Sequence, residues 1–325
     1  MKKSGSTGRQ DRAEAWYRIM MGLAVTAVLG GCGGNSTDDA KDRPIRVVAT
    51  STMLADMVKA LAGDDFEVVG LMAPGVDPHT YEMPARAVAL IRGADVVIYN
   101  GHLLEGKMPD VLEPLAAQGK AVVAAAESLP AESLIHPAGF EGHADPHVWG
   151  DVKLWRQIIE PVREALEAMK PDRAESIRER AAAYGAELDS LDAWIRERIG
   201  GIPEGNRLLV TSHDAFNYFG RAYGMEVIGV QGISTASEAG IADIVGTVDL
   251  IRQRGVKAIF VESSVSRATI ERISKDAGIT IGGELFSDSC GAAGDLETAD
   301  GETWDKGTYI GMMKHNVHAI AHALK

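Results

Sequence analysis

The longest helical pattern in the chain reads PDRAESIRERAAAYGAELDSLDAWIRERIGGIP over residues 171–203. Its apolar residues recur at steps of four and three, which is the period of one helix face. They are Ile177, Ala181, Tyr184, Leu188, Leu191 and Ile195. We expect the helix to begin at Asp172, with Glu175 completing a capping box, and to end before Gly200 and Gly201. At about 1.5 Å per residue it would be roughly 40 Å long, enough to join two lobes, although a surface helix of one large domain has the same pattern.

Short apolar runs alternate with helical patterns on both sides of this helix. The runs cover residues 45–50, 66–71, 95–99, 121–125, 207–211, 225–230, 258–261 and 280–286. The helical patterns cover residues 53–62, 84–91, 111–118, 215–223, 241–253, 267–277 and 305–324. Such alternation predicts an α/β fold in which parallel sheets are covered by helices. We therefore expect two α/β lobes, residues 44–170 and 203–325, joined by one long rigid helix over residues 171–202.

Residues 1–31 have the composition of a bacterial lipoprotein signal peptide. Basic residues precede an apolar run over residues 19–29, and Gly30 and Gly31 lead directly to Cys32. This run is too short to span a bilayer, although an uncleaved membrane anchor is the alternative. We expect lipidation of Cys32, followed by a flexible tether over residues 32–43. The mature protein would then be anchored by lipid to a membrane, on the periplasmic or extracellular face of the cell envelope.

The mature chain would be strongly acidic. Removal of residues 1–31 leaves 28 Lys and Arg against 44 Asp and Glu, a net charge of −16. A surface of this sign disfavours nucleic acid and tolerates cations. Cys290 is the only cysteine besides Cys32, so the mature chain contains no internal disulfide. With 46% apolar and 24% charged residues, the composition is that of a soluble globular protein, and we expect a monomer.

Polar side chains follow the predicted strands, at the edge where open α/β sheets bind ligands. Asp77-Pro78-His79 comes after the second strand and Asp145-Pro146-His147 after the fourth, and each proline restricts the backbone beside an imidazole. His213 lies at the tip of the fifth strand, and Asp288 follows the last one. A lone histidine in such a loop is more often a buried or capping residue. Three imidazoles and one carboxylate, two from each lobe, instead suit a divalent cation, Zn²⁺ first and Mn²⁺ second.

Five segments resemble those of one family, the zinc/manganese solute-binding lipoproteins of bacterial ABC transporters (the TroA/ZnuA-like group). They are 74–82 (PGVDPHTYE), 145–149 (DPHVW), 211–216 (TSHDAF), 286–289 (FSDS) and 308–317 (TYIGMMKHNV). The resemblance implies a metal in the cleft between two lobes, bound by His79, His147, His213 and Asp288. It further implies a protein that is not an enzyme. Such a protein captures a divalent ion outside the cytoplasmic membrane and delivers it to a membrane permease whose ATPase is a separate chain.

The family also indicates which metal is preferred. Members dedicated to manganese commonly have Glu where this chain has His213, and a nitrogen ligand favours zinc. Members dedicated to zinc commonly have a long His-rich loop before the second ligand. Here that loop is short, and we expect His136 and His143 to be solvated. Two departures from the family, His102 after the third strand and Cys290 near Asp288, stay outside the expected ligand set.

Two other classes of protein use similar ligands. A metal-dependent hydrolase keeps an open coordination position for water and a nearby base, for which Glu262 is the best candidate. Four protein ligands instead favour a hydrogen-bonding role for Glu262 and Ser212 beside the metal ligands. A surface adhesin or scaffold with a structural metal is the second alternative. Residues 101–108, GHLLEGKM, nearly match a phosphate-binding loop but lack the hydroxyl that would hold Mg²⁺.

Overall fold

The computed structural model describes residues 43–325 with the exception of Glu141. The signal peptide predicted for residues 1–31, the lipidation site at Cys32 and almost all of the predicted tether lie outside the described residues. The chain divides into two units, Met1–Arg43 and Pro44–Lys325, and the second of these contains both lobes. Within the described part of the chain, no helix combines the length and the apolar character needed to cross a membrane.

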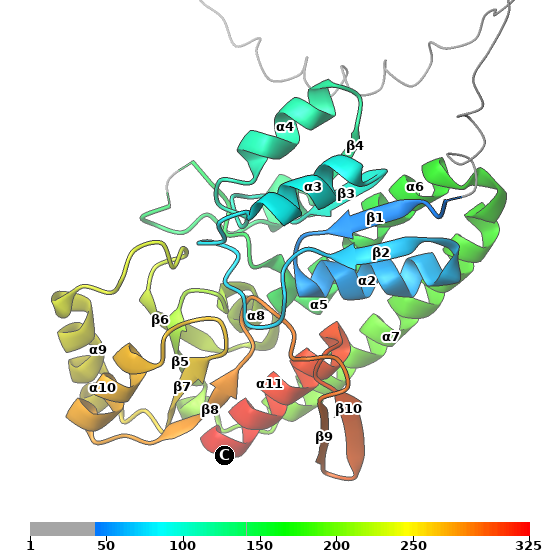
Figure 1. Ribbon diagram of the computed structural model, residues 1–325. Coiled ribbons are helices and arrows are strands. Elements are labelled where there is room, and N and C mark those ends of the chain that lie inside the picture. The colour runs from blue at the N-terminus through cyan, green and yellow to red at the C-terminus, as the bar shows by residue number, and fades with distance from the viewer. Residues whose placement is uncertain (1–42, 141) are drawn as a thin grey trace, which may run out of the picture. The chain divides into compact units, whose positions relative to one another are not determined.

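The first lobe is built on a parallel sheet of four strands in the order β2-β1-β3-β4 (Figure 1). The strands are β1 Arg46–Ala49, β2 Glu67–Gly70, β3 Val96–Tyr99 and β4 Ala121–Ala124. Three helices of this lobe are α2 Thr52–Ala62, α3 Ala85–Gly93 and α4 Pro109–Ala117. Valine-rich runs form these strands because β-branched side chains pack well on a pleated surface. The four strands and three helices predicted over residues 45–118 and 121–125 are confirmed.

The second lobe contains two pairs of parallel strands. They are β5 Leu208–His213, β6 Glu226–Gln231, β7 Ile259–Glu262 and β8 Ile281–Leu285. β5 pairs with β6, β7 pairs with β8, and β5 lies beside β7, so the spatial order is that of the first lobe. The helices are α8 Asn217–Tyr223, α9 Ile241–Arg254, α10 Ala268–Ala277 and α11 Tyr309–Leu324. The carboxyl ends of the strands in the two lobes provide the loops that form the site.

The structure contains further elements that were not predicted from the sequence. The antiparallel hairpin of β9 Leu296–Ala299 and β10 Glu302–Asp305 precedes α11, so the helix predicted over residues 305–324 begins only at Tyr309. α5 Val152–Gln157 and α6 Ile159–Met169 are also additional. Pro161 resembles a helix breaker but lies in the first turn of α6, where the backbone N–H has no acceptor within the helix. Short 3-10 turns cover Gly63–Asp65, Ala125–Ser128, Ala131–Ser133, Val148–Gly150, Pro171–Arg173 and Glu204–Asn206.

One helix of 27 residues, α7 Ala174–Gly200, joins the lobes, as the sequence predicts. All six residues of its predicted apolar face are buried. The predicted capping box is wrong, because Asp172 lies inside a 3-10 turn and not at the N-cap position. Arg173 stands at that position instead and makes no side-chain capping hydrogen bond.

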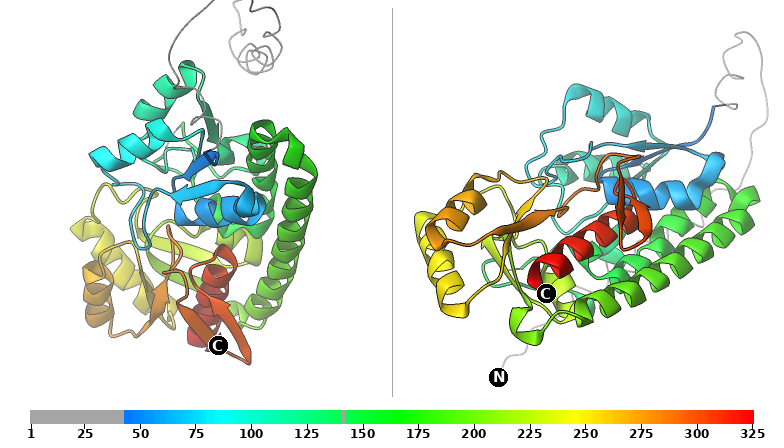
Figure 2. Two further views of the ribbon diagram at one scale, coloured as in Figure 1. Left: turned by 45° about the vertical axis from the view of Figure 1, so that its right-hand side comes forward. Right: turned by 90° about the horizontal axis from the view of Figure 1, so that it is seen from below.

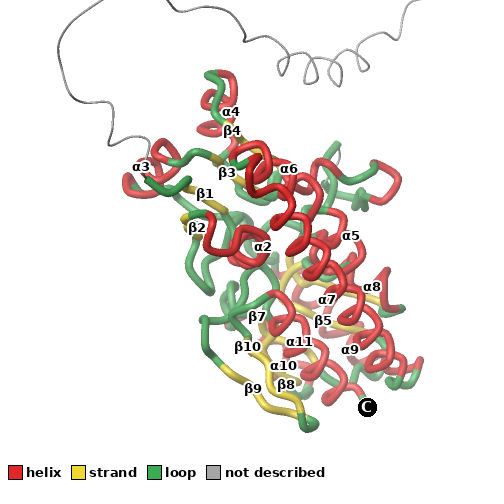
Figure 3. The backbone as a smooth tube through the Cα atoms, turned by 90° about the vertical axis from the view of Figure 1, so that its right-hand side faces the viewer, coloured by secondary structure: helices red, strands yellow, loops and turns green. Residues whose placement is uncertain are grey.

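The main apolar core extends through both lobes and around α7, and each lobe has a further, smaller cluster of its own. This helix packs against α2, α5 and α6 of the first lobe and against α8 and α11 of the second (Figures 2 and 3). Met57 of α2, Leu188 of α7 and Met312 of α11 belong to the same buried cluster. Exposure of buried apolar surface costs about 25 cal/mol per Å². Wide separation of the lobes is therefore strongly disfavoured.

A hydrogen bond to a partly buried carboxylate joins the lobes at the start of α11. Asp56 on α2 accepts the backbone N–H of Tyr309 at 3.0 Å. Burial raises the pKa of Asp56 to about 6, although this hydrogen bond and the charge of Lys59 act to lower it. The ionised form of Asp56 is therefore disfavoured in the folded protein relative to the unfolded chain.

Replacement of Asp56 by Asn should stabilise the folded protein at alkaline pH. Because the folded-state pKa lies above the unfolded value of about 3.9, the stability associated with protonated Asp56 is complete below that value. It is lost as the pH rises through about 6. The pKa shift corresponds to about 2–3 kcal/mol of unfolding free energy at pH 8. Asn keeps an oxygen that can accept the Tyr309 N–H. Urea unfolding of both proteins at pH 4 and pH 8 measures this; an equal difference at the two pH values would contradict it.

Candidate metal centre

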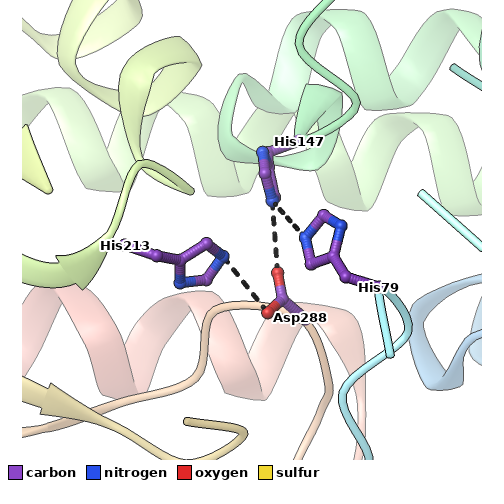
Figure 4. A group of neighbouring side chains, drawn as sticks. All are labelled: His79, His147, His213 and Asp288. Atoms are coloured by element: carbon purple, nitrogen blue, oxygen red, sulfur yellow. Dashed lines mark hydrogen bonds and ion pairs between the residues drawn. The ribbon is translucent and has the colours of Figure 1, made fainter. Parts of the chain in front are cut away.

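The four residues expected to bind metal lie together in the structure (Figure 4). One nitrogen or oxygen atom from each of His79, His147, His213 and Asp288 lies within 4.8 Å of the others, and all four side chains are buried. His79 Nε2 is 3.2 Å from His147 Nε2. The Oδ1 and Oδ2 atoms of Asp288 are 3.4 Å from His147 Nε2 and 3.3 Å from His213 Nε2, respectively. The three imidazoles therefore direct their Nε2 atoms toward the same small volume.

These separations fit a tetrahedral metal site. With metal–ligand bonds of about 2.0–2.1 Å, the ligand atoms of a tetrahedron lie about 3.3–3.4 Å apart. Three of the separations in the site are 3.2, 3.3 and 3.4 Å, and all four ligand atoms lie within 4.8 Å of one another. His213 Nε2 and Asp288 Oδ1 are also buried without a hydrogen-bond partner among the described residues. A bound cation would satisfy both atoms, whose burial is otherwise costly.

The repeated tripeptide forms the same local structure twice. Asp77 Oδ1 accepts the backbone N–H of His79 at 2.9 Å, and Asp145 Oδ1 accepts that of His147 at 2.9 Å. An aspartate that accepts an N–H two residues along the chain closes a tight turn, and the intervening proline limits the backbone further. The sequence Asp-Pro-His therefore places each imidazole on a constrained turn.

Carboxylates hold the second nitrogen of two of the imidazoles. Asp145 Oδ1 is 2.7 Å from His147 Nδ1, and Glu262 Oε2 is 2.5 Å from His213 Nδ1. A carboxylate on Nδ1 fixes the tautomer that leaves Nε2 free to bind metal. Glu262 thus contacts His213, whereas the Ser212 hydroxyl is buried without a partner among the described residues. The contact of Asp145 was not predicted from the sequence, although the aspartate that precedes both histidines is a visible signal.

Burial and the nearby carboxylates act in opposite directions on the pKa values of the histidines. Burial lowers the pKa of His79 to about 3, although Asp288 acts to raise it. Burial also acts to lower the pKa of His147, but Asp145 and Asp288 outweigh it and raise this pKa to about 9. In the same way Glu262 and Asp288 hold the pKa of His213 well above its usual value. The carboxylates thus favour positive charge in the site, which a divalent cation supplies.

The other candidate side chains lie outside this group. His136 and His143 are exposed on their loop, as the sequence predicts. His102 is half-buried, with Nε2 at 3.1 Å from the carbonyl oxygen of Ala126. Cys290 is buried, and burial raises the pKa of its thiol. The described residues contain no second group of three or more His, Cys, Asp or Glu side chains with potential ligand atoms as close together.

Comparison with known proteins places the chain among metal-binding proteins of the same architecture. Residues 47–323 match the family described as zinc-uptake complex component A, periplasmic. The chain is 42% identical over 308 residues to the manganese-binding lipoprotein MntA of Bacillus subtilis, covering 93% of this chain and 97% of MntA. It is also 42% identical to the zinc-binding protein TroA of Treponema pallidum, covering 89% and 92% of the two chains. The solved structure of TroA from Treponema pallidum matches with a TM-score of 0.81 over 87% of this chain and 99% of TroA.

Fold and site together define a two-lobed, metal-binding solute-binding protein of the ABC-transporter type. The chain belongs to the ZnuA/TroA family, as its sequence motifs predict. Members of this family are binding components and not enzymes, which confirms the corresponding prediction. The relatives are named for manganese and zinc and, in the lipoprotein MtsA of Streptococcus pyogenes at 31% identity over 94% of this chain, for iron.

Replacement of Glu262 by Gln should weaken metal binding. Glu262 accepts the backbone N–H of His213 at one oxygen and contacts His213 Nδ1 with the other. In either orientation, a Gln amide would therefore turn its NH₂ group toward one of these two donors. Loss of such an indirect contact lowers metal affinity about 10–100-fold. Competition with a chelator measures the affinity, and Glu204→Gln, at an exposed position of the same lobe, is the control. Equal affinities for Glu262→Gln and the control would refute the role of Glu262.

Proposed function

We propose that this protein binds one divalent cation, with Zn²⁺ favoured over Mn²⁺, and delivers it to the permease of an ABC transporter whose ATPase is a separate chain. The ligands are His79, His147, His213 and Asp288. The observation that carries the proposal is the convergence of three imidazoles and one carboxylate in a buried site. Four protein ligands complete a tetrahedron and leave no position for a reacting water, which suits a carrier.

The preference for zinc rests on the donor atoms. Three nitrogen donors and one oxygen donor suit zinc better than manganese, which favours oxygen ligands. Overall similarity does not distinguish the two metals, because a manganese-binding relative and a zinc-binding relative are each 42% identical to this chain. Within this proposal Mn²⁺ is the second choice and iron the third.

The proposed carrier works at the outer face of a membrane. Cys32 would carry the lipid, and residues 32–43 would tether a monomeric binding protein to the cell envelope. The names of the relatives, which include lipoproteins of metal-uptake systems, support this arrangement. The apolar core shared by the lobes favours metal release through small displacements of the ligands rather than a wide opening of the cleft.

Purified protein should bind one Zn²⁺ per chain, and His147→Ala should abolish high-affinity binding. Removal of a ligand leaves an open tetrahedral site, so the loss should exceed the roughly 10–100-fold effect of removing an indirect contact. Calorimetric titration against a competing chelator gives both stoichiometry and affinity. His143→Ala, on the exposed loop, is the matched control. Unchanged zinc affinity in His147→Ala would place the metal elsewhere and reject the proposed function.

Replacement of His213 by Glu should shift the preference toward Mn²⁺. The change substitutes an oxygen donor for a nitrogen donor at one of the four positions, and oxygen donors suit the harder ion. The measurement is the ratio of Zn²⁺ to Mn²⁺ affinities in competition experiments on wild type and variant. If the ratio is the same in both proteins, the side chain at position 213 does not set the preference for zinc.

A further inference from the structure

The loop after β3 has an unusual backbone. Gly101, His102, Leu103 and Gly106 all have positive φ angles, of 90°, 51°, 64° and 52°. Residues other than glycine adopt such angles at a cost of about 1–3 kcal/mol each, and they persist only where surrounding contacts hold them. Glu105 lies in the middle of this loop. The loop therefore requires strong local contacts to keep its shape.

Glu105 provides those contacts. Its side chain is fully buried. Oε1 accepts the hydroxyl of Thr50 at 2.8 Å and the backbone N–H of Asn100 at 2.6 Å, and Oε2 accepts the backbone N–H of Gly101 at 3.2 Å. Burial raises the pKa of Glu105, although the same hydrogen bonds act to lower it. All three contacts use the carboxyl oxygens as acceptors.

The arrangement also distinguishes this loop from the phosphate-binding loop that its sequence nearly matches. In a phosphate-binding loop, successive backbone N–H groups point at the anion. In this loop the N–H groups of Asn100 and Gly101 point at the carboxylate of Glu105. The carboxyl group of Glu105 therefore occupies the place that a bound anion takes in a phosphate-binding loop.

The loop also touches both turns that carry histidines of the first lobe. Asn100 Nδ2 donates to the carbonyl oxygen of Pro146, next to His147, at 3.0 Å. On the other side, Gly106 packs so closely on the backbone of His79 that a Cβ atom would lie 2.7 Å from the carbonyl oxygen of His79. One loop thus contacts both Asp-Pro-His turns, through the side-chain amide of Asn100 and through the backbone of Gly106.

We propose that Glu105 is a positioning residue for metal binding: its buried carboxylate holds the loop of residues 100–106 in the shape that sets the positions of His79 and His147. The inference rests on the proposed metal-binding function. Glu105 itself does not belong to the group of potential ligands. Its effect passes through Asn100 to one turn and through Gly106 to the other.

Replacement of Glu105 by Gln tests this role. The Gln side chain has the same shape, but its amide group turns N–H donors toward backbone N–H groups. Zn²⁺ affinity should fall about tenfold or more, as for other contacts that orient metal ligands. The visible absorption bands of bound Co²⁺, which report ligand geometry, should shift in position or intensity. Glu132→Gln, at an exposed position of the same lobe, should leave both unchanged.

A second pair of variants tests the loop without changing charge. Gly106→Ala introduces the Cβ atom that would meet the carbonyl oxygen of His79, whereas Gly119→Ala introduces one with nothing within 4 Å. Both glycines have positive φ angles, of 52° and 89°, so backbone strain is present in each variant. Only Gly106→Ala should lower Zn²⁺ affinity and change the Co²⁺ bands.

The outcomes separate the two proposals. If the wild type binds no Zn²⁺, the proposed function itself fails. If the wild type binds Zn²⁺ and folded Glu105→Gln and Gly106→Ala bind it as tightly, with an unaltered Co²⁺ spectrum, the positioning role is wrong. A lower melting temperature alone, with both metal readouts unchanged, would also overturn the positioning role. If Glu105→Gln fails to fold, the comparison of Gly106→Ala with Gly119→Ala tests whether the loop positions the histidines. Equal Zn²⁺ affinities and equal Co²⁺ spectra in these two variants would overturn the positioning role.

Discussion

The apolar core that the lobes share around α7 fixes the distance between the two sets of strand ends. Residues from α2, α7 and α11 belong to one buried cluster, so the cleft cannot widen without exposing that cluster to water. The four potential ligand atoms are consequently held within 4.8 Å of one another, with three of their contacts at 3.2–3.4 Å. A cation that binds there needs only a small further approach of the ligand atoms. Little reorganisation free energy is then required at binding, which favours high affinity.

The loop that carries Asp288 follows β8 of the second lobe and is also bonded to the first lobe. Trp149 Nε1 donates to the carbonyl oxygen of Ser287 at 2.8 Å, and the N–H of Gly75 donates to Ser289 Oγ at 2.9 Å. The N–H of Cys290 donates to Thr52 Oγ1 at 2.7 Å. The second lobe also holds this loop, since Ser264 Oγ donates to Asp288 Oδ2 at 3.1 Å. Hydrogen bonds from both lobes therefore position Asp288 between His147 and His213.

Local patterns in the sequence were sufficient to predict most of the fold. They were not sufficient to predict contacts between residues that are distant in the chain. Continuous β-branched runs such as β3, and the apolar stripe of α7, identify their elements directly. The hairpin of β9 and β10 was missed although Asp300-Gly301, with φ of 52° and 81°, is a strong hairpin signal. The meeting of Glu262 with His213 depends on the adjacency of β5 and β7. The burial of Glu105 runs against the usual exposure of glutamate, so no propensity could predict it.

The rigidity of the site bears on metal selectivity. Mn²⁺ favours more oxygen ligands and a higher coordination number than a closed tetrahedron provides, so accommodating it requires the ligands to move apart. In this protein two imidazoles are fixed on their outer side by Asp145 and Glu262, and the shared core limits movement of the lobes. Expansion of the coordination shell would have to break these contacts. Under the proposed function, selectivity for zinc would then arise from the stiffness of the surroundings as well as from the donor atoms. Loosening either carboxylate contact would reduce the difference in affinity between Zn²⁺ and Mn²⁺.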